Sequence, residues 1–248
     1  MPKAYIVYNP AAGRFPSQLL TERASSVLEK HGWEIELIRT TGGSHITQLA
    51  RQAAQGGVDA FFIAGGDGSV NFAVCGLYDS RTALGVLPAG TANVWAKELG
   101  QHSLTWTRWL ALEESAENLA SASVRRVDIG ICNGKPFLLW AGVGLDAFIV
   151  HSIEPRSRFE KYFAEAPYAA KALRHAASWK GINLLIQADG VDIAGRYLMA
   201  VVSNIHLYAG GYAEISPNAR LDDGIMDLWL FEGDTFLETV AVARELWS

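Results

Sequence analysis

The segment that most limits the possible fold is Val58–Gly68, where an apolar run leads directly into three glycines around one acid. The run from Val58 to Ala64 predicts a buried strand, and a helix is expected to begin near Ser69. Glycines at such a turn let backbone N–H groups approach an anion closely, and the helix dipole adds to the attraction. A carboxylate would repel a phosphate there unless a metal ion or a lysine lay between them. Asp67 therefore indicates a nucleotide site that works with Mg²⁺.

A second turn of the same kind follows the predicted strand Ala83–Leu87. Pro88 ends that strand, and Gly90 frees the backbone beyond it. Thr91 and Asn93 then offer polar side chains at a helix start. Taken alone, this turn is explained equally well by ordinary helix capping, and the first turn by steric needs common to α/β proteins.

A third loop, Asn9–Arg14, follows the first predicted strand, Ala4–Tyr8. Loops that follow parallel strands leave from one edge of the sheet, which is where α/β proteins bind their ligands. The convergence of three such loops, rather than any one of them, predicts a phosphate site.

The organisation of the chain changes near residue 124. Before it, predicted strands alternate with helices, the last of which is expected over Thr105–Ala120. This alternation is typical of a doubly wound parallel sheet. After it, the signals are those of a mainly antiparallel β domain. The predicted fold class is therefore α/β, with a nucleotide-binding domain over residues 1–124 and a β-rich domain over residues 125–248.

Two residue pairs in the second half predict hairpin turns. Asn133-Gly134 separates an apolar run that ends at Cys132 from one that ends at Trp140, and Asp189-Gly190 separates two further runs. Additional strands are expected over Tyr197–Ser203 and Ile225–Phe231, and a broken helical insertion over Glu160–Lys180.

Composition excludes several classes of protein. The formal net charge of −5 argues against a nucleic-acid partner drawn by bulk charge. No apolar stretch approaches the roughly 20 residues that span a bilayer, and the N-terminus carries no secretory signal. The two cysteines, Cys75 and Cys132, are expected to be buried and unpaired, which favours a reducing cytoplasm.

Six segments of the chain resemble those of a known family. The shared segments are Gly65–Ser69, Pro88–Asn93, Val127–Gly130, Ala141–Ala147, Gly210-Gly211 and Pro217–Gly224. Together they resemble the diacylglycerol kinase catalytic family, which includes bacterial lipid kinases and the sphingosine and ceramide kinases. The resemblance runs in register from about Tyr5 to Phe231.

The resemblance implies a fold and a reaction. An α/β domain would precede a β-rich domain, with the active site in the cleft between them. The reaction would transfer the γ-phosphate of ATP to a lipid hydroxyl, diacylglycerol-like or sphingoid, with ATP and Mg²⁺ as cofactors. The partner would be a membrane lipid reached by peripheral contact at the inner face of the cytoplasmic membrane. A homodimer is left open.

The resemblance also assigns roles to particular residues. Asp67 and Asp128 would be catalytic, within a network of Mg²⁺ and phosphate. A second, structural Mg²⁺ would bind the Asp223 carboxylate and the main-chain carbonyls of Arg220 and Ile225, although this loop also reads as a plain β-turn. The implied ATP contacts are Asn9, Thr40, Gly65, Gly66, Asp67, Gly68, Ser69, Val70, Asn71 and Thr91.

The chain departs from the family pattern in three places. Phe72 and Val94 stand where many relatives carry glutamate and aspartate. The family's general base, in an Asp-Gly-Glu segment, would lie beyond Ser248, so the chain is expected to be a fragment or to lack that base. A soluble-substrate kinase resembling NAD kinase, and a non-catalytic nucleotide- or lipid-binding protein, are the alternatives. Trp106 and Trp109, expected in a helix, are either interfacial anchors or, more commonly, core residues.

Overall fold

The computed structural model describes residues 1–10, 17–153 and 179–233 of the chain. The chain divides into two compact units. The first consists of Met1–Leu138 with the short segments Ala209–Gly211 and Leu221–Asp223, and the second of Leu139–Tyr208, Tyr212–Arg220 and Gly224–Ser248.

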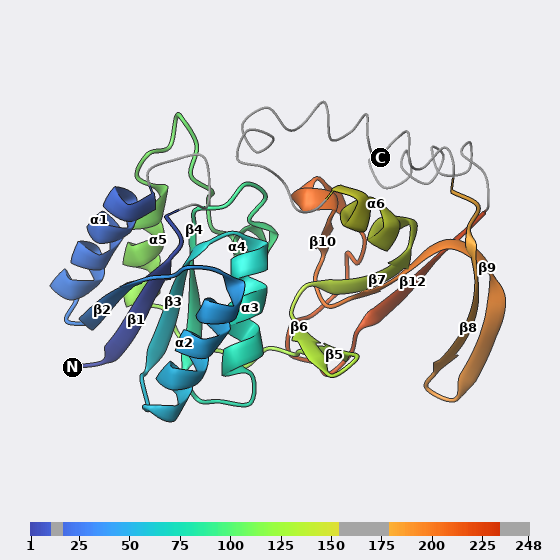
Figure 1. Cartoon of the computed structure of the whole chain (residues 1–248), viewed down its shortest axis with the longest axis horizontal. Helices are drawn as coiled ribbons and strands as arrows, with labels where there is room; N and C mark the ends of the chain where they lie inside the picture. The colour runs from blue at the N-terminus through green and yellow to red at the C-terminus, as the bar shows by residue number, and fades with distance from the viewer. Residues whose placement is uncertain (11–16, 154–178, 234–248) are drawn as a thin grey trace. The chain divides into compact units, whose positions relative to one another are not determined.

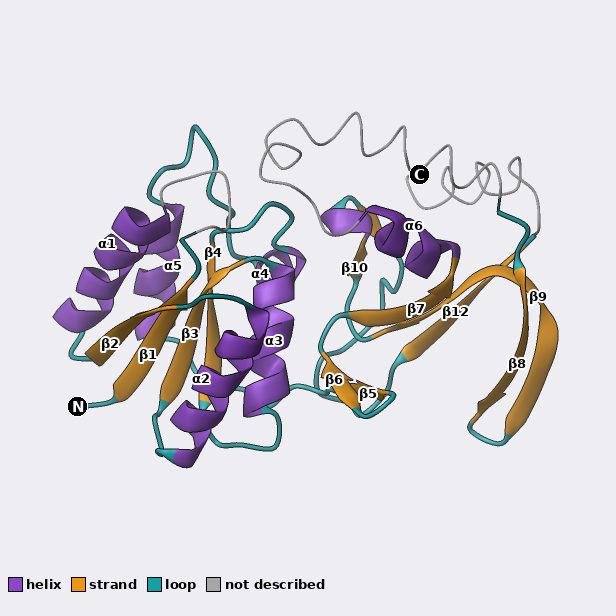
Figure 2. Cartoon of the chain, viewed as in Figure 1, coloured by secondary structure: helices purple, strands orange, loops and turns teal. Residues whose placement is uncertain are grey.

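The first unit is built on a parallel sheet of four strands (Figure 2). Its spatial order is β2-β1-β3-β4, and every neighbouring pair runs parallel. The strands are β1 (Lys3–Tyr8), β2 (Glu34–Arg39), β3 (Ala60–Gly65) and β4 (Ala83–Pro88). The predicted alternation of strands and helices is therefore confirmed.

Helices cover both faces of this sheet, as Figure 1 shows. One face carries α1 (Ser17–Lys30) and α5 (Ala111–Ala120), and the other carries α2 (Gly43–Gln55) and α3 (Asp67–Leu77). A helix of five residues, α4 (Val94–Glu98), follows β4. None of the helices in the described ranges is long and apolar enough to cross a membrane.

The core of the first unit explains the apolar run Val58–Ala64. All six residues of β3 are buried, because helices lie over both sides of the central strands. On one side, Phe62 packs in a cluster with Ile6 of β1, Leu28 of α1 and Leu112 of α5. A strand buried on both faces needs a continuous apolar sequence rather than an alternating one.

The second unit is mainly antiparallel, as predicted. Its sheet has the order β12-β9-β7, and β8 also pairs with β9. The long strand β9 includes both the run that follows Asp189-Gly190 and the segment Tyr197–Ser203, which were predicted as separate strands. The elements are β7 (Trp140–Gly144), α6 (Leu145–Ile153), β8 (Ile182–Ala188), β9 (Val191–Ser203), β10 (Leu207–Tyr208), β11 (Ala213–Glu214) and β12 (Asp227–Glu232).

Both predicted hairpin turns are confirmed. Asn133 and Gly134 join β5 (Gly130–Cys132) to β6 (Lys135–Phe137), with φ angles of 50° and 74°. Asp189 and Gly190 join β8 to β9, with φ angles of 48° and 80°. Two consecutive positive φ angles define the tight hairpin turn that these residue pairs favour. The first hairpin lies within the first unit.

Three expectations need correction. Helix α5 begins at Ala111 rather than Thr105, and residues 105–110 form a turn closed by an antiparallel bridge between Thr105 and Arg108. Helix α3 begins at Asp67, two residues before Ser69. Neither cysteine is fully buried, since Cys132 is exposed on the short strand β5 and Cys75 is half-buried. Most of the predicted insertion Glu160–Lys180 lies outside the described residues.

Helices α2 and α3 approach closely at Gly76. A Cβ built there would lie 2.5 Å from both the Ala50 Cβ and the Thr47 carbonyl oxygen. We expect Gly76→Ala to lower the free energy of unfolding by about 1–3 kcal/mol, since backbone atoms cannot yield easily. Gly68→Ala in the same helix is the control, because its Cβ would meet nothing within 4 Å. It should be neutral or stabilising by up to about 1 kcal/mol. Urea unfolding followed by circular dichroism checks both, and equal effects would contradict the packing argument.

Candidate functional site

The candidate site lies at the edge of the parallel sheet where its strands end. Because all four strands are parallel, Asn9, Thr40, Gly65 and Pro88 leave the sheet on the same side. From β1 the chain continues to β2 on one side of the sheet, and from β3 it continues to β4 on the other side. The strand order therefore reverses between β1 and β3, which is the switch point of the sheet. Doubly wound proteins bind ligands in the crevice at such a point.

The two predicted glycine turns are in direct contact at this edge. A Cβ built on Gly90 would lie 2.3 Å from the Gly66 Cα and 2.8 Å from the Gly66 nitrogen. The Ala89 N–H also donates to the Gly65 carbonyl oxygen at 3.2 Å. Any side chain at Gly90 would force the turns apart. The convergence of these two turns is therefore confirmed.

Asn93 organises the second turn from inside. It is 2% exposed and has a φ of 51°. Its Oδ1 accepts the Gly90 N–H at 2.9 Å, and its Nδ2 donates to the Gly90 carbonyl oxygen at 3.0 Å and to Ser103 Oγ at 3.1 Å. A buried amide with these partners fixes the turn, and it ties residue 103 to the same edge.

Asp67 joins the first turn to the helix that follows the second. Its Oδ1 accepts the main-chain N–H of Trp95 at 3.0 Å. Trp95 is the second residue of α4, so this bond satisfies a first-turn N–H that has no acceptor within its own helix. Neither the Thr91 nor the Asn93 side chain caps α4, although capping was the alternative explanation of this turn. The Asp67 carboxylate caps α4 instead, from a distant segment of the chain.

The start of α3 fits a bound phosphate group. The Gly66 carbonyl oxygen accepts the N–H groups of Ser69 and Val70, at 2.8 and 3.1 Å, which orders the first turn. Gly68 is exposed, and the space beside its backbone is open. Asn71 is exposed one turn later. A helix start with an open backbone and a positive dipole end is a suitable place for a phosphate.

The other predicted nucleotide contacts differ in exposure. Asn9 is half-buried at the end of β1, and Thr91 is exposed. Thr40 is 1% exposed, and its hydroxyl donates to the Gly42 carbonyl oxygen at 3.0 Å, so its side chain orders the turn before α2. Arg14, the last residue of the loop predicted after the first strand, lies outside the described residues.

Asp128 and the Asp222-Asp223 loop meet through the main chain. The Asp128 N–H donates to the Leu221 carbonyl oxygen at 2.6 Å. Asp223 is exposed beside Gly224, which has a φ of 76°. One carboxylate with main-chain carbonyls is a set of hard oxygen donors that suits Mg²⁺. Among the described residues, no group of three or more His, Cys, Asp or Glu side chains could hold a metal ion.

The sequence did not reveal the role of Lys97, which lies near the end of α4. Its Nζ donates to the Gly210 carbonyl oxygen at 3.0 Å, and its aliphatic stem packs against Gly211. Ala209, Gly210 and Gly211 all have positive φ angles, of 49°, 76° and 84°. Lys97 thereby attaches this left-handed turn to the helix that Asp67 caps.

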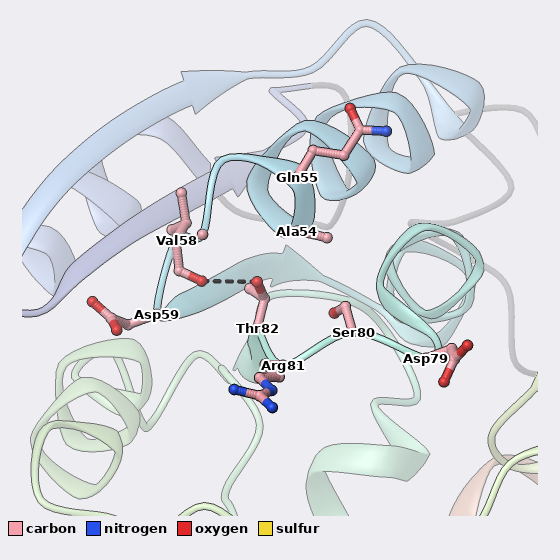
Figure 3. A pocket seen from close by; sticks show the side chains of 9 residues that line it. Ala54, Gln55, Val58, Asp59, Asp79, Ser80, Arg81 and Thr82 are labelled. Carbon is pink, nitrogen blue, oxygen red and sulfur yellow. Dashed lines mark hydrogen bonds between the residues drawn. The ribbon is translucent and has the colours of Figure 1, made fainter.

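A hollow lies at the opposite edge of the sheet, before β3 and β4 begin (Figure 3). There the Thr82 hydroxyl donates to the Val58 carbonyl oxygen at 2.8 Å. The hollow is lined by Ala54, Gln55, Gly57, Val58, Asp59, Asp79, Ser80, Arg81 and Thr82. Because the strands begin here, this hollow is separate from the glycine turns.

In the second unit, Asp146 places a carboxyl group against the sheet. A Cβ on Gly142 would lie 2.5 Å from its Oδ2, so only glycine leaves room for it. Burial raises the pKa of the Asp146 carboxyl above its ordinary value, and a hydrogen bond with the Tyr208 side chain offsets part of that rise. Tyr208 belongs to the hydrophobic cluster that also contains Leu145, Met199 and Val201.

Comparison with known proteins supplies a family context. A model of the diacylglycerol kinase catalytic domain matches residues 3–132, and a model of the YegS C-terminal NAD kinase beta sandwich-like domain matches residues 140–247. A protein named diacylglycerol kinase from Bacillus subtilis (strain 168) is 29% identical over 248 aligned residues, covering 98% of this chain and 78% of that protein.

Two further similar proteins are also named diacylglycerol kinases. A protein named diacylglycerol kinase from Staphylococcus carnosus (strain TM300) is 26% identical, covering 91% of this chain and 71% of that protein. The crystal structure of a diacylglycerol kinase from Bacillus anthracis str. Sterne aligns with a TM-score of 0.76 at 21% identity, covering 99% of this chain and 81% of that one. That likeness shows a shared fold.

The raised pKa of Asp146 predicts a pH dependence of stability. Between the pKa of an unfolded aspartate, about 4, and the higher folded pKa, the unfolded carboxyl has lost its proton while the folded carboxyl still holds it. The free energy of unfolding must therefore fall as pH rises, until the folded pKa is passed. Asp146→Asn keeps an acceptor for Tyr208 and removes the ionisation. Its melting temperature should exceed that of the unaltered chain by more at pH 7 than at pH 4.

The control for this experiment is Asp192→Asn, at an exposed carboxyl on β9. Melting curves of all three proteins at both pH values decide the question. A difference between Asp146→Asn and the unaltered chain that does not change with pH would contradict the prediction.

Proposed function

This chain belongs to the diacylglycerol kinase catalytic domain family, and on that basis we propose that it transfers the γ-phosphoryl group of ATP to the hydroxyl of a membrane lipid. Diacylglycerol-like and sphingoid lipids are the acceptors we place first. The observation that carries this proposal is the contact between the glycine turns at Gly66 and Gly90, which holds the start of α3, with its open backbone at Gly68, at the switch point of the sheet.

We assign the nucleotide to the loops at this edge. The phosphates would lie against Gly65–Asn71, where the start of α3 presents N–H groups and Gly68 leaves the approach open. Asn9, Thr40 and Thr91 complete the proposed contacts. Thr40 would contribute through the turn that its hydroxyl orders, since its side chain is buried.

Asp67 and Asp128 are the residues to which we assign the Mg²⁺ and phosphate network. Phosphoryl transfer depends on positioning and on compensation of negative charge more than on covalent chemistry by the protein. The Trp95 N–H holds the Asp67 carboxylate in one orientation beside the phosphate position. Mg²⁺, when bound, supplies the positive charge that lets a carboxylate and a polyphosphate share this edge.

Asp67→Asn separates the charge of this carboxylate from its structural bond. Asparagine keeps an Oδ1 that can accept the Trp95 N–H, so the melting temperature should change little. Loss of the charge should reduce both Mg²⁺-dependent ATP affinity and lipid phosphorylation by about 10- to 100-fold. Calorimetry with and without Mg²⁺ measures the first quantity. Transfer from radiolabelled ATP to dioleoylglycerol or sphingosine in mixed micelles measures the second.

Asp79→Asn is the matched control. Asp79 has a φ of 63°, which asparagine tolerates well, and it lies just beyond the other end of α3. Equal nucleotide affinity and activity in Asp67→Asn and Asp79→Asn would refute the assignment.

The same assay tests a second function. The model that matches residues 140–247 is described as NAD kinase beta sandwich-like, which favours a soluble nucleotide acceptor as the alternative. Phosphorylation of NAD but of no lipid would establish that alternative. Nucleotide binding without transfer to either acceptor would establish a non-catalytic binding protein.

We further propose that the loop around Asp223 binds a structural Mg²⁺ through that carboxylate and the main-chain carbonyls of Arg220 and Ile225. An ion that binds only the folded chain stabilises it by mass action. EDTA should therefore lower the melting temperature of the unaltered chain, by a few degrees, but not that of Asp223→Ala. Asp222→Ala, at the neighbouring carboxylate, should remain sensitive to the chelator. If all three proteins respond alike, the loop is a plain turn.

A further inference from the structure

Residues 105–110, here called the tryptophan turn, form a compact turn with exposed aromatic rings. The Arg108 N–H donates to the Thr105 carbonyl oxygen at 3.1 Å, and the Thr105 N–H donates back to the Arg108 carbonyl oxygen at 3.5 Å. Trp106 is 64% exposed, Trp109 39% and Leu110 52%. Large apolar side chains grouped on one exposed turn indicate a surface used for binding.

The two indole rings stabilise each other in this exposed position. Their centroids are 5.9 Å apart, with an angle of 70° between the ring planes. Such an edge-to-face pair is a favourable aromatic arrangement, so the two rings present one joint surface. An indole combines an apolar body with a polar N–H group, which suits the boundary between lipid headgroups and acyl chains.

The tryptophan turn is anchored at the edge of the sheet that carries the candidate nucleotide site. The Leu104 N–H donates to the carbonyl oxygen of Pro88, the last residue of β4, at 3.4 Å. Ser103 accepts a hydrogen bond from Asn93, which orders the second glycine turn. The connection between α4 and α5 therefore leaves from the carboxyl edge of the sheet, as Figure 1 shows.

The charges on this connection suit an anionic surface. Arg108 is the only Asp, Glu, Lys or Arg in residues 101–110, so the segment carries one cation and no carboxylate. The Arg108 Nε lies 3.9 Å from a Glu114 carboxylate oxygen, and 43% of the Arg108 side chain is exposed. An exposed guanidinium whose residue lies between two tryptophans in the sequence can bind phosphate groups while the indole rings enter the interface.

We infer that the tryptophan turn inserts into the headgroup region of a phospholipid bilayer and so brings the candidate phosphate site to its lipid substrate. The inference rests on the proposed function for the identity of that substrate. A lipid kinase needs its phosphate donor next to the membrane surface, and the bonds through Leu104 and Ser103 place the aromatic rings at that same edge.

The test is sedimentation of the full chain with vesicles made of equal parts phosphatidylcholine and phosphatidylglycerol. The unaltered chain should bind, and W106S/W109S should bind at least about tenfold more weakly, because two large apolar side chains are lost. Both rings are exposed, so the substitutions should leave the melting temperature nearly unchanged. If the double variant does not fold, W106S alone, at the more exposed ring, gives the same comparison with a smaller expected loss.

Tyr78→Ser is the matched control. Tyr78 is 52% exposed and follows the last residue of α3, at the opposite edge of the sheet, so its removal should leave vesicle binding unchanged. Failure of the unaltered chain to bind vesicles would overturn the inference, as would equal binding by the tryptophan variant. Sedimentation velocity tests the alternative that a second copy of this chain, rather than a membrane, binds the tryptophan turn. A dimer that W106S/W109S dissociates, with vesicle binding intact, would also overturn it.

Phosphorylation of a water-soluble short-chain diacylglycerol requires no membrane binding, so this assay tests the proposed function separately from the membrane inference. If that lipid is not phosphorylated in any protein tested, the kinase proposal fails. Vesicle binding by the unaltered chain and its loss in the tryptophan variant still decide whether the turn is a membrane surface.

Discussion

The close approach of Gly66 and Gly90 is the constraint on which the functional edge of the first unit depends. Parallel pairing sets Gly65 of β3 opposite Pro88 of β4, so both chains must turn away from the sheet at the same level. With 2.3 Å between a Cβ on Gly90 and the Gly66 Cα, there is room for backbone alone. The starts of α3 and α4 are therefore held side by side, and a ligand at one helix start lies near the other.

A carboxylate at the proposed phosphate site would repel the phosphate, and the hydrogen bond from the Trp95 N–H to Asp67 compensates part of the negative charge. The N–H donated to Oδ1 fixes the orientation of the side chain. It does not cancel the charge, and α4 has only five residues, so its dipole adds little. A polyphosphate at this edge would still need a cation beside it. The same residue therefore has a structural role, which asparagine can keep, and in the proposed function an electrostatic role, which asparagine cannot keep.

Local patterns predicted the elements better than the contacts between them. The apolar run of β3 and the turns at Asn133-Gly134 and Asp189-Gly190 depend on neighbours in the sequence, and they were predicted correctly. The bond from Trp95 to Asp67 joins residues 28 positions apart, and Lys97 reaches Gly210 across 113 positions. Periodicity carries no signal for such pairs. The prediction that the last helix begins at Thr105 was wrong, because Thr105 and Arg108 close a turn through their own main-chain hydrogen bonds.

The charge of the chain bears on how a lipid could be reached. A net charge of −5 gives no general attraction to an anionic membrane. At physiological salt, however, charges farther than about 8 Å away are largely screened, so the residues nearest the surface dominate. If the tryptophan turn faces the membrane, as we propose, those residues are two indoles, a leucine and one arginine. Burial of apolar surface is not screened by salt, in contrast to attraction between charges. An acidic protein can therefore hold its substrate-facing edge against a membrane by placing aromatic side chains, rather than a basic patch, at that edge.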